Sequence, residues 1–276
     1  MAVVLALLAA AVYGAADFYG GFASRRTPAV TVVVLSQFAG IIVLAIGWFA
    51  LPGKFYPSDV GWGIAAGFAG SIAIAALYTA LAVGRMGVVS PITAVVGASV
   101  PVVAGVLLGE RPTSQAIVGV VCAFVAVALV SANVETHRMS LREPGLIPAL
   151  ISGAAIGALF LLLGYGHADA GLTRLAVTRA TSVLLLVTFA LVRRETLRPA
   201  AGSLRAILFA GALDMTANVL FIAATRYGLL SIVAVLTSLY PASTVFLARV
   251  VLRERLSRSQ WFGIGLAACG VALITI

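Results

Sequence analysis

One stretch of the chain returns in diverged form 144 positions later, and this duplication constrains the fold more than any other feature of the sequence. Residues 80–131 align without a gap with residues 224–275, and about a third of the aligned positions are identical. Some of these matches reflect apolar composition. A Glu-Arg pair, however, recurs in register between two hydrophobic runs, at Glu110-Arg111 and at Glu254-Arg255. The sequence therefore predicts two copies of one structural unit.

Both copies are too apolar for a soluble protein. Hydrophobic residues make up 62% of the chain and charged residues 10%, whereas about a quarter of the residues of a soluble domain are charged. The basic residues behind the net charge of +9 lie singly or in short clusters between apolar runs, not along one face. The charge therefore indicates orientation in a membrane and argues against a nucleic-acid partner. We expect a lipid bilayer to surround most of the chain.

Ten apolar runs are long enough to cross that bilayer, because about 20 helical residues span a hydrocarbon core roughly 30 Å thick. The predicted helices cover residues 2–22, 29–51, 60–83, 88–108, 114–133, 145–166, 172–192, 203–226, 229–252 and 258–276. Each half contains five helices, an odd number, so the second half must enter the membrane in the opposite direction. The expected fold class is all-α, an integral membrane protein of ten transmembrane helices in two inverted five-helix repeats. The polar connection 134–144 places the repeats at 1–139 and 140–276.

The distribution of Arg predicts the orientation in the membrane. The odd-numbered connections carry most of the basic residues, among them Arg25, Arg26, Arg138, Arg193 and Arg253. The positive-inside rule then places these connections in the cytoplasm and both termini outside. We expect a multi-pass protein of the cytoplasmic membrane, inner or plasma, in a bacterium.

Asp17 is the first candidate for a binding residue, because a carboxylate within a membrane helix is costly and normally faces a polar cavity. Tyr13 precedes it by four residues and Gly20 follows by three, so one helix face carries a phenol, a carboxylate and space for a close neighbour. The alternative is that Asp17 lies near the interface and anchors Arg25 or Arg26.

A second set of polar residues falls in the middle of two later helices. Asp214 and Asn218 share one face of residues 203–226, and Arg179 lies within 172–192, with Gln37 at the comparable position of 29–51. These groups suit the polar end of a solute, since Arg can hold a carboxylate in a fork geometry. The alternative is a structural ion pair between Asp214 and Arg179, and a pair that lines the cavity would serve both purposes.

Proline predicts where the matched fourth and ninth helices bend, because it removes a backbone donor and clashes with the preceding turn. The residues expected at these kinks are Pro91, Thr93, Pro101, Thr237 and Pro241. Bending at matched positions suits an alternating gate, although a static packing kink is the alternative. Tyr78 and Tyr240 are candidates for ring contacts with a ligand, or for ordinary packing.

Small residues predict how the last helix of each half packs. Gly119, Gly263 and Gly270 indicate a seam between the fifth and tenth helices, away from the substrate. His167 is expected in solvent, and Arg174 is expected to extend from its helix end toward the surface. We find no P-loop, hydrolase or metal-ligand motif, and therefore expect neither an enzyme nor a cofactor or metal.

The chain resembles a ten-helix, EamA-type member of the drug/metabolite transporter superfamily. The similarity covers the doubled five-helix unit, the stretch from Gly228 to Pro241, and the runs that end in Leu-Gly-Glu-Arg at 108–111 and Leu-Arg-Glu-Arg at 252–255. The chain differs at Gly97, where the pattern has the proline that Pro241 supplies, and at Tyr13, where it has Trp. The resemblance implies a basket of helices around a central cavity that exports or imports amino acids, metabolites or organic cations.

The first helix is similar to that of small multidrug resistance proteins, in which an embedded carboxylate binds cation and proton in turn. The matching residues are Ala16, Asp17, Gly20 and Arg25, so the resemblance implies this role for Asp17. We therefore expect a monomeric or homodimeric secondary transporter that moves a small-molecule substrate, with protons as a possible coupling ion. An uncoupled facilitator and a non-transporting scaffold subunit are the alternatives.

Overall fold

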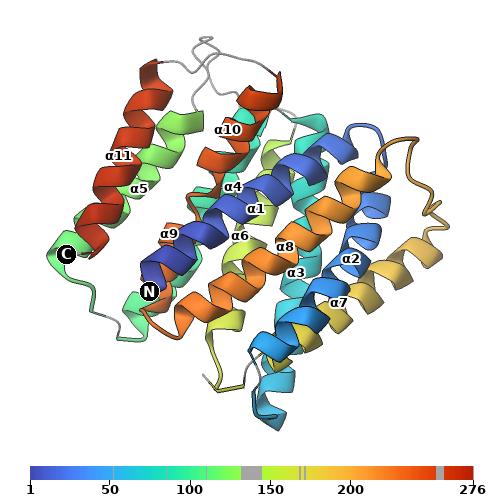
Figure 1. The fold of residues 1–276 in the computed structure, drawn as a ribbon, viewed down its shortest axis with the longest axis horizontal. Helices are drawn as coiled ribbons and strands as arrows, with labels where there is room; N and C mark the ends of the chain where they lie inside the picture. Colours follow the sequence, from blue (N-terminus) through green and yellow to red (C-terminus); the bar gives the residue numbers. More distant parts are fainter. Residues whose placement is uncertain are drawn as a thin grey trace.

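The chain folds into a bundle of helices, shown in Figure 1. The computed structural model describes residues 1–51, 53–84, 86–109, 111–131, 145–167, 169–170, 172–252 and 258–275, and these contain no strand. The first five helices are α1 (Ala2–Ser24), α2 (Ala29–Ala50), α3 (Pro57–Val83), α4 (Met86–Leu107) and α5 (Ser114–Ser131). The others are α6 (Leu146–Gly164), α7 (Thr173–Val192), α8 (Leu204–Thr225), α9 (Leu230–Thr237), α10 (Tyr240–Leu252) and α11 (Arg258–Thr275).

The predicted all-α membrane architecture is confirmed. Six helices, α1, α2, α3, α6, α7 and α8, are long and apolar enough to cross a membrane by length and composition alone. The ninth predicted span is divided into α9 and α10, so the described residues form eleven helices where the sequence predicted ten. The connection 134–144, on which the predicted boundary between the repeats rests, lies outside the described residues, as do Glu110 and the pair Glu254-Arg255.

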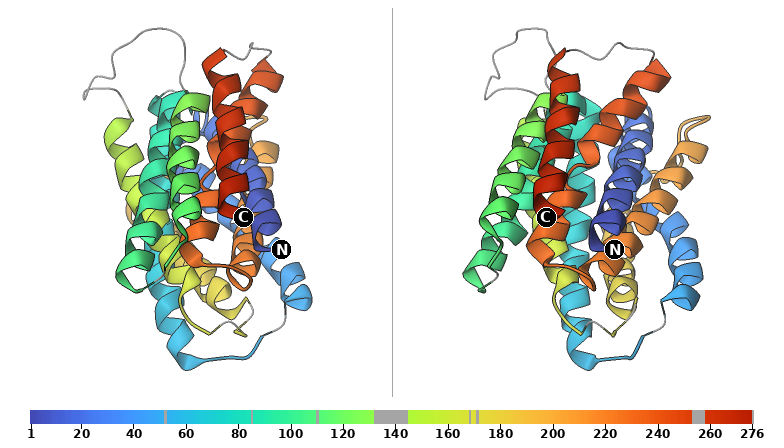
Figure 2. Two further views of the ribbon diagram at one scale, coloured as in Figure 1. Left: turned by 90° about the vertical axis from the view of Figure 1, so that its left-hand side faces the viewer. Right: turned by 60° about the vertical axis from the view of Figure 1, so that its left-hand side comes forward.

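Helix packing follows the two-fold relation between the halves. α1 packs most extensively against α8, and its counterpart α6 packs against α3. In the same way, the packing of α2 against α8 matches that of α7 against α3, and the packing of α4 against α6 matches that of α10 against α1. The pair α5 and α11 lies at one edge of the bundle in Figure 1, and both views in Figure 2 show the two helices side by side. The interior is therefore formed by helices from both halves.

Glycine permits the closest of these contacts. A methyl group at Gly211 of α8 would overlap the backbone of Ser36 in α2, and one at the matched Gly67 of α3 would overlap Thr181 in α7. Two hydroxyl groups of α7 form hydrogen bonds across this close contact. Thr178 Oγ1 donates to Gly63 O at 3.1 Å, and Ser182 Oγ donates to Gly67 O at 3.0 Å. Small residues and interhelical hydrogen bonds replace the hydrophobic effect as the means of joining helices in lipid.

The surface and the interior have the polarity expected of a membrane protein. Large apolar side chains point outward, with Phe49 88% and Leu107 79% exposed. Polar groups such as Asp17, Gln37 and Arg179 are instead buried within the bundle. Because lipid cannot satisfy a polar group, this arrangement concentrates the polar residues around an internal site.

Candidate functional site

A central cavity is lined by helices from both halves of the chain and brings the predicted polar residues together. The space open to the centres of water-sized molecules is about 80 Å³. Since one water needs roughly 10–15 Å³ measured in this way, the cavity has room for several waters or a small solute. Its wall contains all eight residues predicted to bind substrate or proton, namely Tyr13, Asp17, Gln37, Tyr78, Arg179, Asp214, Asn218 and Tyr240.

Asp17 and Tyr13 enter the cavity from α1. Asp17 is 7% exposed and forms no hydrogen bond or ion pair with any residue that the structure describes. The Tyr13 hydroxyl, one turn away, is buried without a hydrogen-bond partner. Two residues of α1 therefore present unpartnered polar groups to the cavity. The alternative prediction, an ion pair with Arg25 or Arg26, is not found.

Arg179 and Asp214 form an ion pair in the cavity wall. Arg179 Nη2 donates to Asp214 Oδ2 at 2.7 Å, which joins α7 to α8. Asn218, one turn further along α8, donates through Nδ2 to Asp214 O at 2.8 Å and to Asp214 Oδ1 at 3.4 Å. The pair is thus both a structural contact and part of the cavity surface. Because its two charges cancel, Asp17 supplies the cavity's uncompensated negative charge when it is ionised.

Further polar and aromatic groups complete the wall. Gln37 Oε1 is buried and has no hydrogen-bond partner. Tyr78 is 1% exposed, and its ring lies so close to Gly20 that a methyl group there would overlap it. α6 contributes an apolar patch to the wall, formed by Ile156, Leu159 and Phe160. The cavity therefore offers a ligand both a polar and an apolar side.

The ninth span is interrupted beside the cavity. α9 ends at Thr237 and α10 begins at Tyr240, so the cavity-lining tyrosine and Pro241 start a new helix. Thr237 Oγ1 is buried without a hydrogen-bond partner. α10 is held against α1 here, because Thr244 Oγ1 donates to Gly14 O at 3.1 Å. The break predicted at Pro241 thus lies at the site itself.

α4 differs from this matched span. Its helix continues from Met86 to Leu107 through both Pro91 and Pro101, and Gly97 occupies the position that Pro241 has in the second half. The interruption seen before Tyr240 in the second half has no counterpart at Gly97. None of the described residues of α4 lines the cavity. α6 packs along α4 and provides that wall instead.

The seam glycines lie away from the cavity. Gly119, Gly263 and Gly270 are buried, and a methyl group at Gly270 of α11 would lie 2.9 Å from Gly119 O of α5. None of the three lines the cavity. Their position suits the scaffold role predicted for these two helices, since close backbone contact leaves no space for a solute.

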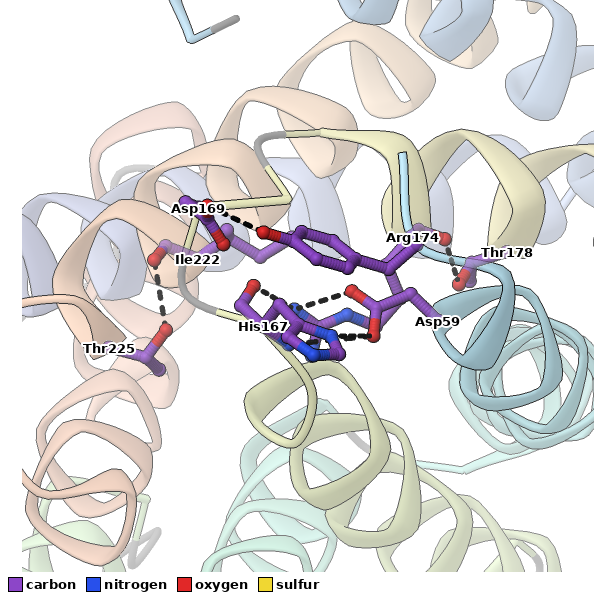
Figure 3. Close-up of polar contacts among 8 residues, drawn as sticks. Asp59, His167, Asp169, Arg174, Thr178, Ile222 and Thr225 are labelled. Carbon is purple, nitrogen blue, oxygen red and sulfur yellow. Dashed lines mark hydrogen bonds and ion pairs between the residues drawn. The ribbon is translucent and has the colours of Figure 1, made fainter. Parts of the chain in front are cut away.

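A second polar cluster lies at the end of the bundle where α3 and α7 begin, and sequence reasoning missed it (Figure 3). Asp59 is fully buried and its Oδ1 accepts from His167 Nδ1 at 3.1 Å, while its Oδ2 lies 3.9 Å from Arg174 Nη2. Arg174 is 4% exposed. The expectation that it extends toward the surface is therefore wrong, because the carboxylate of Asp59 draws the guanidinium inward. Asp59, Gly63 and Gly67 follow one another at intervals of four residues, so they share one helix face. This spacing could have indicated that Asp59 lies on a face packed closely against another helix.

The cluster continues into the two connections above it. The His167 ring stacks on Tyr56, with centroids 3.8 Å apart, and so is half-exposed instead of simply solvated. The Tyr56 hydroxyl donates to Asp169 Oδ2 at 2.7 Å, and this hydrogen bond lowers the pKa of Asp169 and raises the pKa of Tyr56. These contacts fasten the α2–α3 connection to the α6–α7 connection.

Comparison with known proteins identifies the family. The family model described as "EamA-like transporter family" matches residues 1–132 and again residues 143–276. The chain belongs to this family. EamA-like proteins are transporters and not enzymes, which agrees with the multi-pass membrane fold.

A solved structure shows that the fold is a known one. A crystal structure whose title names only a protein superposes with a TM-score of 0.78 over 99% of this chain and 96% of its own, at 14% identity. At that identity the similarity concerns the fold alone. None of the curated proteins compared matches this chain.

Proposed function

We propose that this EamA-like protein is a secondary transporter that exports small metabolites carrying a cationic group, such as amino acids or organic cations, by alternating access. The observation that carries the proposal is the unpartnered carboxylate of Asp17 in a cavity whose other charges form a pair. An ionised carboxylate in a low-dielectric site is costly unless a counter-charge is present. Asp17 therefore binds either the cationic group of a solute or a proton.

Competition at Asp17 provides the coupling. A proton that enters from one side displaces the cationic solute, and the solute that enters from the other side displaces the proton. Tyr13 and Gln37 have unsatisfied polar atoms beside this position, so they orient the bound solute. The apolar patch of α6 receives its apolar part.

The helix packing supports two moving bodies that each mix the halves. α1, α2, α8 and α10 pack together as one group, and α3, α4, α6 and α7 as the other. The cavity lies between the groups, and the Arg179–Asp214 ion pair and the Thr93–Tyr240 hydrogen bond cross from one to the other. Rocking of these bodies, with flexure at the α9–α10 break, would expose the site to each side in turn.

Solute flux in proteoliposomes tests the proposal. Purified protein should accumulate a labelled solute against its concentration gradient when a pH gradient is applied. Flux that only equilibrates the solute would indicate an uncoupled facilitator. Absence of flux, together with failure of hydrophilic thiol reagents to reach cysteines placed at Asp214 and Asn218, would indicate a scaffold subunit.

A further inference from the structure

Thr93 lies just outside the cavity wall and contacts one of its residues. It is fully buried in α4, whereas the cavity wall contains no described residue of that helix. Its hydroxyl lies 2.8 Å from the hydroxyl of Tyr240, which does line the cavity. This hydrogen bond joins α4 to the start of α10, the second piece of the span that matches α4 in the other half.

The direction of the hydrogen bond follows from the other contacts of Thr93. Its Oγ1 lies 2.8 Å from Ser90 O and 3.2 Å from Val89 O. A carbonyl accepts only, and a hydroxyl has one proton, so a Thr93 hydroxyl that donates to the Ser90 or Val89 carbonyl has no proton for Tyr240. In that arrangement, on which the inference below rests, Tyr240 is the donor to Thr93. With its proton directed away from the cavity, the Tyr240 oxygen can offer a ligand only a lone pair.

Other groups of the wall have the same polarity. Ionised Asp17 is an acceptor only and has no described partner. Asn218 directs Nδ2 at Asp214, which leaves its Oδ1 as an acceptor, and Gln37 Oε1 is buried without a donor. These acceptors lie beside Asp17 in a wall whose donors include the Arg179 guanidinium, which is already paired with Asp214. A ligand that carries N–H groups as well as positive charge would satisfy them.

We infer that Thr93 is a positioning residue that makes the cavity selective for protonated amines, which keep at least one N–H, over quaternary ammonium ions. The inference rests on the proposed function, because it requires a cationic substrate at Asp17. A quaternary ammonium ion satisfies the charge of Asp17 but leaves the Tyr240 oxygen and the neighbouring acceptors unpaired. Without Thr93, the Tyr240 proton is free to turn into the cavity, where it opposes a ligand N–H.

Binding of matched amines to the purified protein tests this role. The probes are N,N-dimethylphenethylammonium, which has one N–H, and its N,N,N-trimethyl analogue, which has none, measured by calorimetry at one pH. The native protein should bind the N–H probe about tenfold more tightly or better, the usual value of a hydrogen bond to a charged group. Thr93→Val should remove that preference by weakening the N–H probe alone, and Thr93→Ser should retain it.

A double-mutant cycle separates positioning from a structural effect. Tyr240→Phe should lose the preference, and adding Thr93→Val to Tyr240→Phe should cause no further loss. The inference is wrong if Thr93→Val weakens both probes equally, leaves the preference unchanged, or has the same effect in the Tyr240→Phe background. If the native protein binds neither probe, the cationic substrate of the proposed function is wrong, and the inference falls with it.

Discussion

Arg179 and Asp214 form a 2.7 Å ion pair that crosses from α7 to α8 in the wall of the central cavity. The guanidinium is 8% exposed and the carboxylate 23%, so neither charge is well solvated. The pair links the two proposed moving bodies at the position where a solute would bind. A solute that competes for either partner would therefore loosen the connection between them.

Removal of one partner of this pair should destabilise the protein strongly. Arg179→Ala leaves Asp214 without its counter-charge, and breaking such a buried pair costs about 3–5 kcal/mol. Thermal unfolding in detergent should show a large fall in Tm. Arg179→Met combined with Asp214→Leu should recover most of the Tm while solute flux stays abolished. Recovery of flux in that double variant would show that the pair has no part in transport.

The loss of stability on replacing a glycine by alanine should depend on which atoms the added methyl group would meet. Gly211→Ala forces α8 against the Ser36 backbone, which cannot move aside, and should cost about 1–3 kcal/mol or more. Gly67→Ala meets chiefly the Thr181 side chain and should cost less. Gly61→Ala meets nothing within 4 Å and should be neutral or stabilising by up to about 1 kcal/mol. Equal Tm values for the three variants would contradict the close packing.

Distances between spin labels should show whether the two proposed groups of helices move as rigid bodies. Labels at Arg25 and Val83 report on α1 and α3, which belong to different groups, and their distance should change when solute or pH is changed. Labels at Val83 and Arg193 report on the ends of α3 and α7, and labels at Arg25 and Arg205 report on the ends of α1 and α8. Because each pair belongs to one group, these two distances should stay constant. If instead the Arg25–Arg205 distance changes and the Arg25–Val83 distance does not, the halves of the sequence move as units.

Tyr56→Phe should raise the pKa of Asp169 toward its ordinary value, because the Tyr56 hydrogen bond is the main cause of its lowering. The variant keeps the ring that stacks on His167. A lowered folded-state pKa gives stability that is present above the unfolded pKa, about 3.9, and is lost as pH falls through the folded value. The free energies of unfolding of the native and variant proteins should therefore differ at pH 6 and become equal in acid, where Asp169 is protonated in both. An unchanged Asp169 pKa, measured by carboxyl ¹³C NMR, would contradict this contact.

The sequence was sufficient to predict most of the helices and eight of the residues in the cavity wall, for a clear physical reason. Apolar runs of membrane length determine the spans, and a polar residue within such a run, like Asp17 or Asn218, must face the interior. Whether Asp214 paired with Arg179 could not be predicted, because that depends on how α7 and α8 meet.

Tertiary packing also explains what sequence reasoning missed. Asp59 lies near a helix start, where a carboxylate is ordinarily solvated, and only the glycine face of α3 against α7 buries it beside Arg174. The prolines of α4 were expected to mark a bend in a gating helix, and the structure shows that α6 packs along α4 and supplies cavity residues that α4 does not. Prolines mark where a helix can bend, and they do not indicate which face the helix presents.

Proton movement during solute flux tests the central claim most directly. Proteoliposomes that contain a pH-sensitive dye should show one direction of proton flow when solute flows in the other. Asp17→Asn should abolish the proton signal and solute accumulation, while Asp17→Glu, which keeps a carboxyl group, should retain both in weakened form. Coupled proton and solute flux that persists in Asp17→Asn would contradict the account.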